Sequence, residues 1–108
     1  MKNRRSAREA ALRLLAQREH TRIELTEKLR KKGHDEAEIS ALLDDFSERG
    51  FLSECRAAEL FLIKALSDTS YGLRYWHRKM IERGFPDELV REVLQKIRQQ
   101  VDEKAAAS

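Results

Sequence analysis

Basic and aromatic residues alternate in one short stretch of the chain, SYGLRYWHRKMIERGF, which covers residues 70–85. Arginine and lysine side chains neutralise phosphates, and aromatic rings stack on unpaired bases. The stretch therefore has the chemistry of a nucleic-acid-binding surface. Its candidate contacts with DNA or a protein partner are Tyr71, Arg74, Arg78, Lys79 and Arg83.

A second basic cluster comes earlier and ends in the sequence LRKKG. Cations at the C-terminal end of a helix also complement the helix dipole, so part of this cluster has a local stabilising role. The candidate contacts here are Arg22, Lys28, Arg30, Lys31 and Lys32.

The aromatic residues also have a purely structural interpretation. Trp76 is predicted to be buried, because the helical spacing puts it on an apolar face. Tyr71 is predicted to pack within its turn, and Tyr75 fits either the core or the surface.

Residues with catalytic or metal-binding potential are few and scattered. The three histidines, His20, His34 and His77, are far apart and have no partner at metal-ligand spacing. Neither a phosphate-binding GxxxxGKS nor a GxSxG motif occurs. We expect no catalytic residue, no metal, no cofactor and no enzyme activity. Cys55 is the single cysteine, which predicts a packed, reduced thiol.

The composition fits a small, charged globular protein. The chain has 108 residues, of which 41% are hydrophobic and 38% charged, with a net charge of +3. No apolar run approaches the roughly 18 residues of a membrane span, and the N-terminus lacks the apolar segment of a signal peptide. A cytoplasmic protein that does not bind membranes is expected.

The charges are unevenly distributed along the chain. Residues 1–33 have a net charge of +7 (11 basic, 4 acidic), and residues 34–60 have −6 (2 basic, 8 acidic). Residues 61–108 have +2 (9 basic, 7 acidic). This segregation is compatible with one basic and one acidic face, or with an ordinary solvated helical surface.

The spacing of apolar residues predicts helices throughout the chain. A first helix is expected at about Arg4–Arg18. Thr21 and Glu24 have capping-box spacing at the start of a second helix, where each side chain accepts a backbone N–H of the other. Gly33 ends this helix, because glycine takes a left-handed backbone at little cost. The predicted apolar face of the second helix consists of Ile23, Leu25 and Leu29.

The remaining chain predicts four more helices. The third begins after Asp35 and ends at Gly50, and the fourth follows Ser53. A turn at Asp68–Gly72 separates the fourth helix from the fifth, which ends at Gly84. The final KAAAS segment is expected to fray. The predicted apolar face of the third helix consists of Ile39, Leu42, Leu43 and Phe46, and that of the fourth consists of Ala57, Ala58, Phe61, Leu62 and Ala65. The predicted apolar face of the fifth helix consists of Leu73, Trp76, Met80 and Ile81. The sixth helix begins near Pro86, and its predicted apolar face consists of Leu89, Val90, Val93, Leu94, Ile97 and Val101.

The two halves of the chain repeat one pattern at an offset of 51 residues. Gly33 corresponds to Gly84, and apolar positions correspond to apolar positions. We therefore predict an all-α protein of two tandem, helix-turn-helix-like three-helix repeats with about six helices and no strands. The predicted repeats are residues 1–52 and 53–108, and the protein is expected to be a monomer. Further matched pairs are Leu12 with Ile63, Leu25 with Trp76, and Leu29 with Met80.

Three blocks of the sequence together resemble the RecX family. The first block, REHTRIELTEKLRKKG, is similar to a family pattern R-x-H-S-x-x-E-L-x-x-K-L. The other two blocks are ISALLDDFSERGFL and SYGLRYWHRKMIERGF, and the resemblance covers about residues 7–98. The residues at family-like positions are Arg18, His20, Thr21, Glu24, Leu25, Lys28 and Leu29; Gly50, Phe51, Leu52, Glu54, Arg56 and Ala58; and Tyr71, Gly72, Tyr75, Met80, Arg83, Gly84 and Phe85.

This resemblance implies tandem three-helix repeats and a non-enzymatic role. Members of the family bind RecA in the groove of its filament on single-stranded DNA, and they typically restrain its ATPase and strand exchange. The implied setting is homologous recombination, DNA repair and the SOS response.

Several positions depart from the family pattern. Most members have a third repeat, whereas the length of this chain predicts a short, two-repeat form. Asp68, Thr69 and Ser70 stand where basic residues are usual, and Leu73 stands where proline is frequent. The central block has Ala57 where an aromatic residue is usual. These departures predict a shorter contact surface with weaker binding to RecA, a different partner, or a divergent short regulator.

Two alternatives to a RecA regulator remain open on the sequence alone. One is a small helical protein that binds single- or double-stranded DNA through a basic helix face. The other is a helical adaptor that binds a protein through the acidic stretch Asp35–Glu59.

Overall fold

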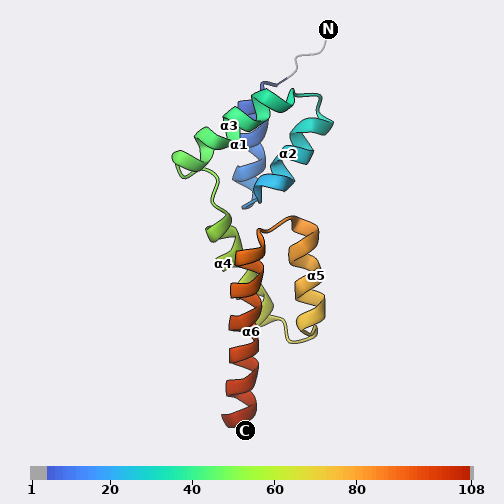
Figure 1. The fold of residues 1–108 in the computed structure, drawn as a ribbon, viewed down its shortest axis with the longest axis vertical. Coiled ribbons are helices and arrows are strands. Elements are labelled where there is room, and N and C mark those ends of the chain that lie inside the picture. The colour runs from blue at the N-terminus through green and yellow to red at the C-terminus, as the bar shows by residue number, and fades with distance from the viewer. Residues whose placement is uncertain (1–4, 108) are drawn as a thin grey trace. The chain divides into compact units, whose positions relative to one another are not determined.

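The computed structural model describes residues 5–107, and side chains from residue 5 to residue 101. Six α-helices and no β-strand are found in these residues (Figure 1). The predicted all-α fold with three helices in each half is therefore confirmed. The helices are α1 (Ala7–Gln17), α2 (Arg22–Lys31), α3 (Glu36–Glu48), α4 (Glu54–Ser67), α5 (Leu73–Arg83) and α6 (Asp87–Ala107).

The chain divides between Glu54 and Cys55 into two compact units. The first unit contains α1, α2 and α3; the second contains α5, α6 and all of α4 after its first residue. Each unit has its own hydrophobic core, and the two cores share no residue. A repeat boundary after residue 52 stays a prediction.

The helices of the first unit begin at side-chain caps. Thr21 accepts the backbone N–H of Glu24, whose carboxylate accepts the backbone N–H of Thr21, so the predicted capping box is confirmed. Ser6 and Glu9 form a second capping box at α1, which the sequence analysis missed. The helix therefore begins at Ala7, later than predicted, and the predicted start at Arg4 lies outside the described residues.

The matched glycines end corresponding helices. Gly33 follows α2 with a φ of 92°, and Gly84 follows α5 with a φ of 82°. Residues with a side chain rarely adopt this left-handed conformation, which explains why glycine stands at both positions.

The core of the first unit lies between all three of its helices. Leu25, Leu43 and Phe46 have no exposed surface. Ile23, which was predicted on the apolar face of α2, is instead 53% exposed. It lies in the first turn of α2, two residues before Leu25, and thus on another side of the helix. The complete core cluster consists of Ala10, Ala11, Leu25, Leu29, Ile39, Leu43, Phe46 and Leu52.

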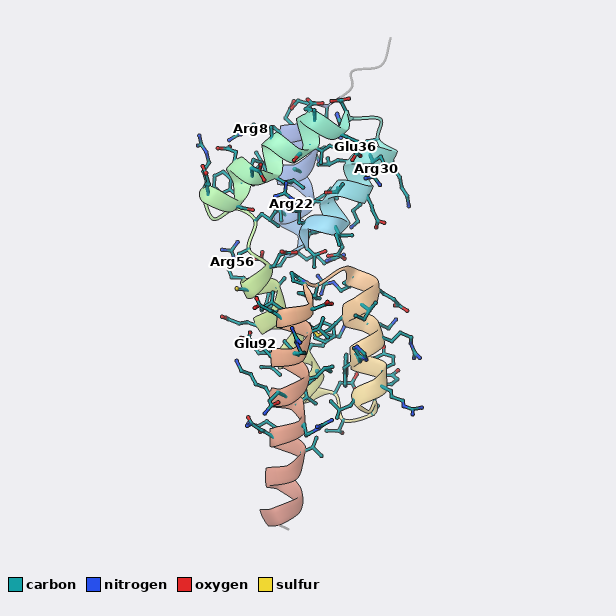
Figure 2. The ribbon with its side chains drawn as sticks, in the orientation of Figure 1. Arg8, Arg22, Arg30, Glu36, Arg56 and Glu92 are labelled. Atoms are coloured by element: carbon teal, nitrogen blue, oxygen red, sulfur yellow. The ribbon has the colours of Figure 1, made fainter. Side chains whose placement is uncertain are left out.

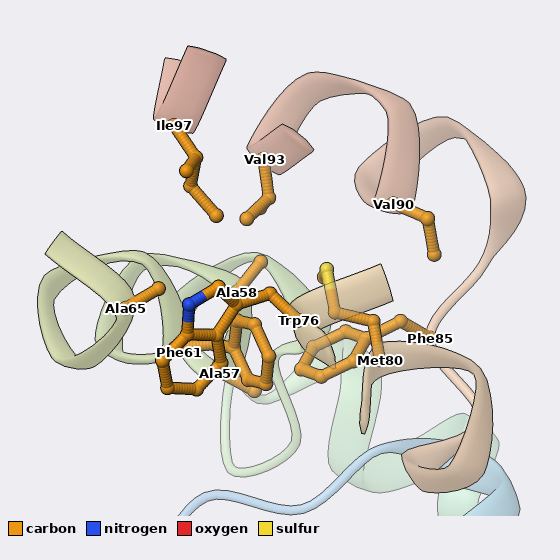
Figure 3. Packing of buried hydrophobic residues seen from close by; sticks show 10 residues of the cluster. All are labelled: Ala57, Ala58, Phe61, Ala65, Trp76, Met80, Phe85, Val90, Val93 and Ile97. Carbon is orange, nitrogen blue, oxygen red and sulfur yellow. The ribbon is translucent and has the colours of Figure 1, made fainter. Parts of the chain in front are cut away.

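The core of the second unit is built around Trp76 (Figure 3). The Phe61 ring meets Trp76 edge-on with 5.6 Å between ring centroids, and meets Phe85 edge-on at 5.8 Å. Trp76 is only 3% exposed, which confirms its predicted place in the core. Ile81 and Val101 were predicted to face the core, but both are more than half exposed.

One matched pair of the repeat does not face either core. Leu12 is 40% exposed, and Ile63, its counterpart 51 residues later, is 63% exposed. Similarity between the two halves therefore extends to positions outside the cores.

The last helix of the second unit is longer than its counterpart in the first. Helix α6 has 21 residues and α3 has 13. Gly50 follows α3 with a φ of 80°, whereas Val101 stands at the corresponding position and continues α6. The helix runs to Ala107 although we expected the KAAAS segment to fray; alanine has the highest helix propensity of all residues.

Candidate partner-binding surface

Several charged side chains of the first unit are paired with one another. Arg22 Nη1 lies 2.9 Å from Asp44 Oδ1, and Arg22 Nη2 donates to the carbonyl of Ser40 at 3.2 Å. Arg30 Nη2 donates to Glu36 Oε1 at 3.1 Å, and Figure 2 shows these two side chains extending toward each other. Both arginines of α2 are therefore paired with acidic residues of α3.

A further pairing links α1 to the same acidic helix. Arg8 Nη1 lies 3.3 Å from Asp45 Oδ2, and Arg49 Nε lies 2.9 Å from Asp45 Oδ1. The hydrogen bond from Arg49 lowers the pKa of Asp45, just as the hydrogen bond from Arg30 lowers the pKa of Glu36. Opposite charges from residues 1–33 and from α3 thus meet inside the first unit.

The first family-like block has a structural role at the start of α2. Arg18 donates to both carboxylate oxygens of Glu24, at 3.3 and 2.9 Å, while Glu24 caps the helix together with Thr21. Arg18 also donates to the carbonyl of Glu19 at 2.8 Å. These residues hold the turn between α1 and α2, so their presence is explained by the fold.

His20 is a fully buried member of the same block. Its Nε2 lies 2.9 Å from Lys28 Nζ, and its Nδ1 lies 2.9 Å from the carbonyl oxygen of Arg18. The lysine can only donate, so we assign Nε2 as the acceptor and Nδ1–H as the donor. Burial is the main cause that lowers the pKa of His20 below 6.5. Lys28, predicted to contact a partner, therefore directs its ammonium to His20 within the unit.

Acidification is expected to destabilise the first unit through His20. Below pH 6.5 the unfolded chain protonates this histidine, whereas the folded state resists protonation until a lower pH. The stability contribution is thus present above pH 6.5 and decreases as the pH falls. Urea unfolding at about pH 7.5 and about pH 5.5 measures the effect. Between these two pH values, the free energy of unfolding should decrease more in the wild type than in His20→Gln. Equal losses in both proteins would contradict this role of His20.

Removal of the Thr21 hydroxyl is expected to destabilise the first unit by about 1 kcal/mol. The substitution Thr21→Ala leaves the backbone N–H of Glu24 without its side-chain acceptor. Chemical denaturation measures the effect, and Thr21→Ser is the matched control because it keeps the oxygen. If Thr21→Ser lost as much stability as Thr21→Ala, the capping contribution would be refuted.

Two predicted contacts of the first unit remain available at its surface. Lys31 and Lys32 are exposed at the end of α2, and neither forms an ion pair among the described residues. They differ in this respect from Arg22 and Arg30, whose guanidinium groups are held by acceptors of α3.

The second unit presents basic residues on α5, which has four basic residues and one acidic residue. Arg74 and Arg78 are exposed, and neither forms an ion pair within the described part of the chain. Lys79 Nζ lies 5.4 Å from the centroid of the Tyr75 ring and 3.6 Å from Glu82 Oε1. We call Arg74, Arg78 and Lys79 the α5 basic face. Arg83 is half-buried, with its guanidinium carbon 5.2 Å from the centroid of the Phe85 ring.

Three aromatic rings form a cluster beside this face. Tyr71 and Tyr75 are stacked, with 3.8 Å between ring centroids and 13° between ring planes. Trp76 meets Tyr71 edge-on at 5.9 Å and Tyr75 edge-on at 4.8 Å. Tyr71 therefore packs on its neighbours as predicted, but it remains 48% exposed. Tyr75, whose position the sequence left open, is half-buried.

A groove of about 650 Å³ opens next to Tyr71, entirely within the second unit. It lies between the end of α4, the turn before α5, the start of α5 and the second half of α6. Sequence reasoning did not find this groove, because it depends on the packing of α6 against the turn. We call it the Tyr71 groove; its walls include Leu73, Trp76, Ile97 and Val101, and its polar residues include Asp68, Thr69, Arg98 and Gln100.

Other chemical features of the described residues are limited. No group of three or more histidine, cysteine, aspartate and glutamate side chains among them could hold a metal ion. Cys55 is exposed, so the prediction of a packed thiol was wrong. The buried stripe of α4 begins only at Ala57, after the turn that contains Cys55. None of the described helices is long and apolar enough to cross a membrane.

The two units define a helical repeat protein whose second unit has a basic and aromatic surface. Residues 7–46 match the model of the first three-helix domain of RecX. The chain is 40% identical over 90 residues to the regulatory protein RecX of Halorhodospira halophila, and 38% identical over 88 residues to that of Chromohalobacter salexigens. The chain belongs to the RecX family.

The matches differ in how much of each protein they cover. They include 83% and 82% of this chain, but 55% and 57% of the two relatives. The chain thus spans about half the length of the curated relatives it matches. The crystal structure of RecX from Lactobacillus salivarius has a TM-score of 0.76 and 22% identity, covering 82% of this chain and 57% of that one. This structural likeness concerns the fold.

Proposed function

We propose that this chain is a non-enzymatic regulator that binds RecA, or its filament on single-stranded DNA, and restrains RecA ATPase and strand exchange. The proposal is supported by membership of a family of regulatory proteins. The observation that carries it is the α5 basic face, whose exposed Arg74 and Arg78 form no ion pair among the described residues.

The proposed mode of action is occupation of a surface and requires no cofactor. A RecA filament on DNA presents phosphates that attract cations over the range of the Debye length. Arg74, Arg78 and Lys79 supply such cations on one helix, and Lys31 and Lys32 supply two more in the first unit. Arg22 and Arg30 have weaker claims, because they would have to leave Asp44 and Glu36.

A filament-binding experiment tests this proposal. Labelled protein is titrated with RecA filaments assembled on single-stranded DNA with a non-hydrolysable ATP analogue, and in parallel with the same DNA alone. We expect saturable binding to filaments at concentrations where the DNA alone is mostly unbound. Binding that is equal with and without RecA would overturn the proposal.

The α5 basic face also supports a second candidate, a small DNA-binding protein that acts without RecA. This function predicts a steep loss of affinity for DNA as salt increases, with a slope that reflects the number of phosphates contacted. The adaptor hypothesis has less support, since Asp44 and Asp45 of its acidic surface are paired with arginines of the same unit.

A further inference from the structure

We infer that the Tyr71 groove binds an unpaired base of single-stranded nucleic acid, which stacks on Tyr71 while the neighbouring phosphates contact the α5 basic face. The inference deepens the proposed function, because a RecA filament contains single-stranded DNA. It also makes a claim about direct nucleic-acid contact that can be tested without RecA.

The tyrosine pair provides a prepared stacking platform. Tyr71 lies flat on Tyr75, and the edge-on contacts of both rings with Trp76 fix the pair to the core. Tyr71 lines the groove, whereas Tyr75 does not. The groove therefore borders the surface of the Tyr71 side chain that Tyr75 does not cover. A base that stacks there would extend an existing stack without immobilising a mobile ring, which reduces the entropy cost of binding.

The groove has the size and lining that a base requires. Its volume of about 650 Å³ is within the usual range of small-molecule sites. Leu73, Ile97 and Val101 supply apolar walls, while Thr69 and Gln100 can exchange hydrogen bonds with the edge of a base.

The distribution of charges suits the Tyr71 groove to a base and the α5 basic face to phosphates. The groove contains one acidic and one basic residue, Asp68 and Arg98, and Asp68 already accepts the backbone N–H of Ser70 at 3.1 Å. Such a site suits a neutral base better than a phosphate. The cations of the α5 basic face lie outside the groove lining, with Lys79 and Arg78 next to the Tyr75 ring. Only Glu82 opposes them on this helix.

Fluorescence anisotropy of a labelled oligothymidylate of about 12 nucleotides, titrated with the full chain in the absence of RecA, tests the inference. We expect binding to the oligothymidylate at least about tenfold tighter than to an abasic backbone of the same length and charge. Tyr71→Leu should weaken binding roughly tenfold or more with an unchanged salt slope, whereas Tyr71→Phe should bind as the wild type. Binding should also change the fluorescence of Trp76, the single tryptophan.

Three results would overturn the inference. These are equal affinity for the abasic backbone, unchanged affinity of a folded Tyr71→Leu protein, and absence of oligothymidylate binding at low salt. If the last result occurred while the chain still bound RecA filaments, the proposed function would stand and only the role of the Tyr71 groove in binding nucleic acid would be lost. Failure of this inference can therefore be distinguished from failure of the proposed function.

Discussion

Replacement of Phe46 by alanine is expected to reduce the stability of the first unit by about 3–5 kcal/mol, which is most of the stability of a unit this small. Phe46 has no exposed surface and meets the Phe51 ring edge-on at 5.4 Å. Arg8 also lies over its ring, with 5.2 Å between the guanidinium carbon and the ring centroid. The truncation would leave a cavity between α1, α2 and α3.

The second unit should survive this substitution, because the two cores share no residue. The only tryptophan and both tyrosines belong to the second unit, so fluorescence reports on that unit alone. In a thermal scan of Phe46→Ala, far-ultraviolet circular dichroism should show an early loss of helix while Trp76 fluorescence keeps its transition. Phe61→Ala is the matched variant and should shift the Trp76 transition. Coincident early transitions in Phe46→Ala would contradict separate cores.

Neutralisation of the α5 basic face should produce the largest effect on binding. The triple variant Arg74→Gln, Arg78→Gln, Lys79→Gln removes three cations and leaves the core residues of α5 in place. We expect at least a tenfold loss of affinity for RecA filaments at low salt and a flatter dependence on salt concentration, because fewer counterions are released. The filament-binding titration described above measures both quantities.

A charge-matched control separates this local effect from net charge. Arg13→Gln, Arg91→Gln, Lys96→Gln removes three exposed cations from α1 and α6. The affinity of this control for filaments should be within about threefold of that of the wild type, because most surface charges outside a contact have small effects on binding. Equal losses in both triple variants would show that general attraction, and not the α5 basic face, governs binding.

Local features of the fold were predictable from the sequence. The Thr21 cap, the glycines after α2 and α5 and the burial of Trp76 depend on residues within one turn or on helical period. The Ser6 cap has the same spacing to Glu9 and could have been found in the same way. The exposure of Ile81 could not have been predicted in this way. A helical pattern shows which face of a helix is apolar, but not how much of that face the neighbouring helices cover.

The candidate surface depended more on tertiary packing. The list of basic residues gave no way to tell that Arg22 is held by Asp44, 22 positions away, while Arg78 forms no ion pair among the described residues. The adjacent segments of opposite net charge were the available signal for neutralisation within the first unit. The stack of Tyr71 on Tyr75 had no such signal, because Tyr71 lies in the turn before α5 and helical spacing does not apply to it.

The DNA-dependent ATPase of RecA, titrated with this chain at roughly 50 mM and 200 mM salt, tests the central claim most directly. The proposed function predicts inhibition at concentrations well below those that coat the naked DNA, together with loss of inhibition in the α5 triple variant. Unchanged ATPase at an excess of folded protein would contradict a role as a RecA regulator.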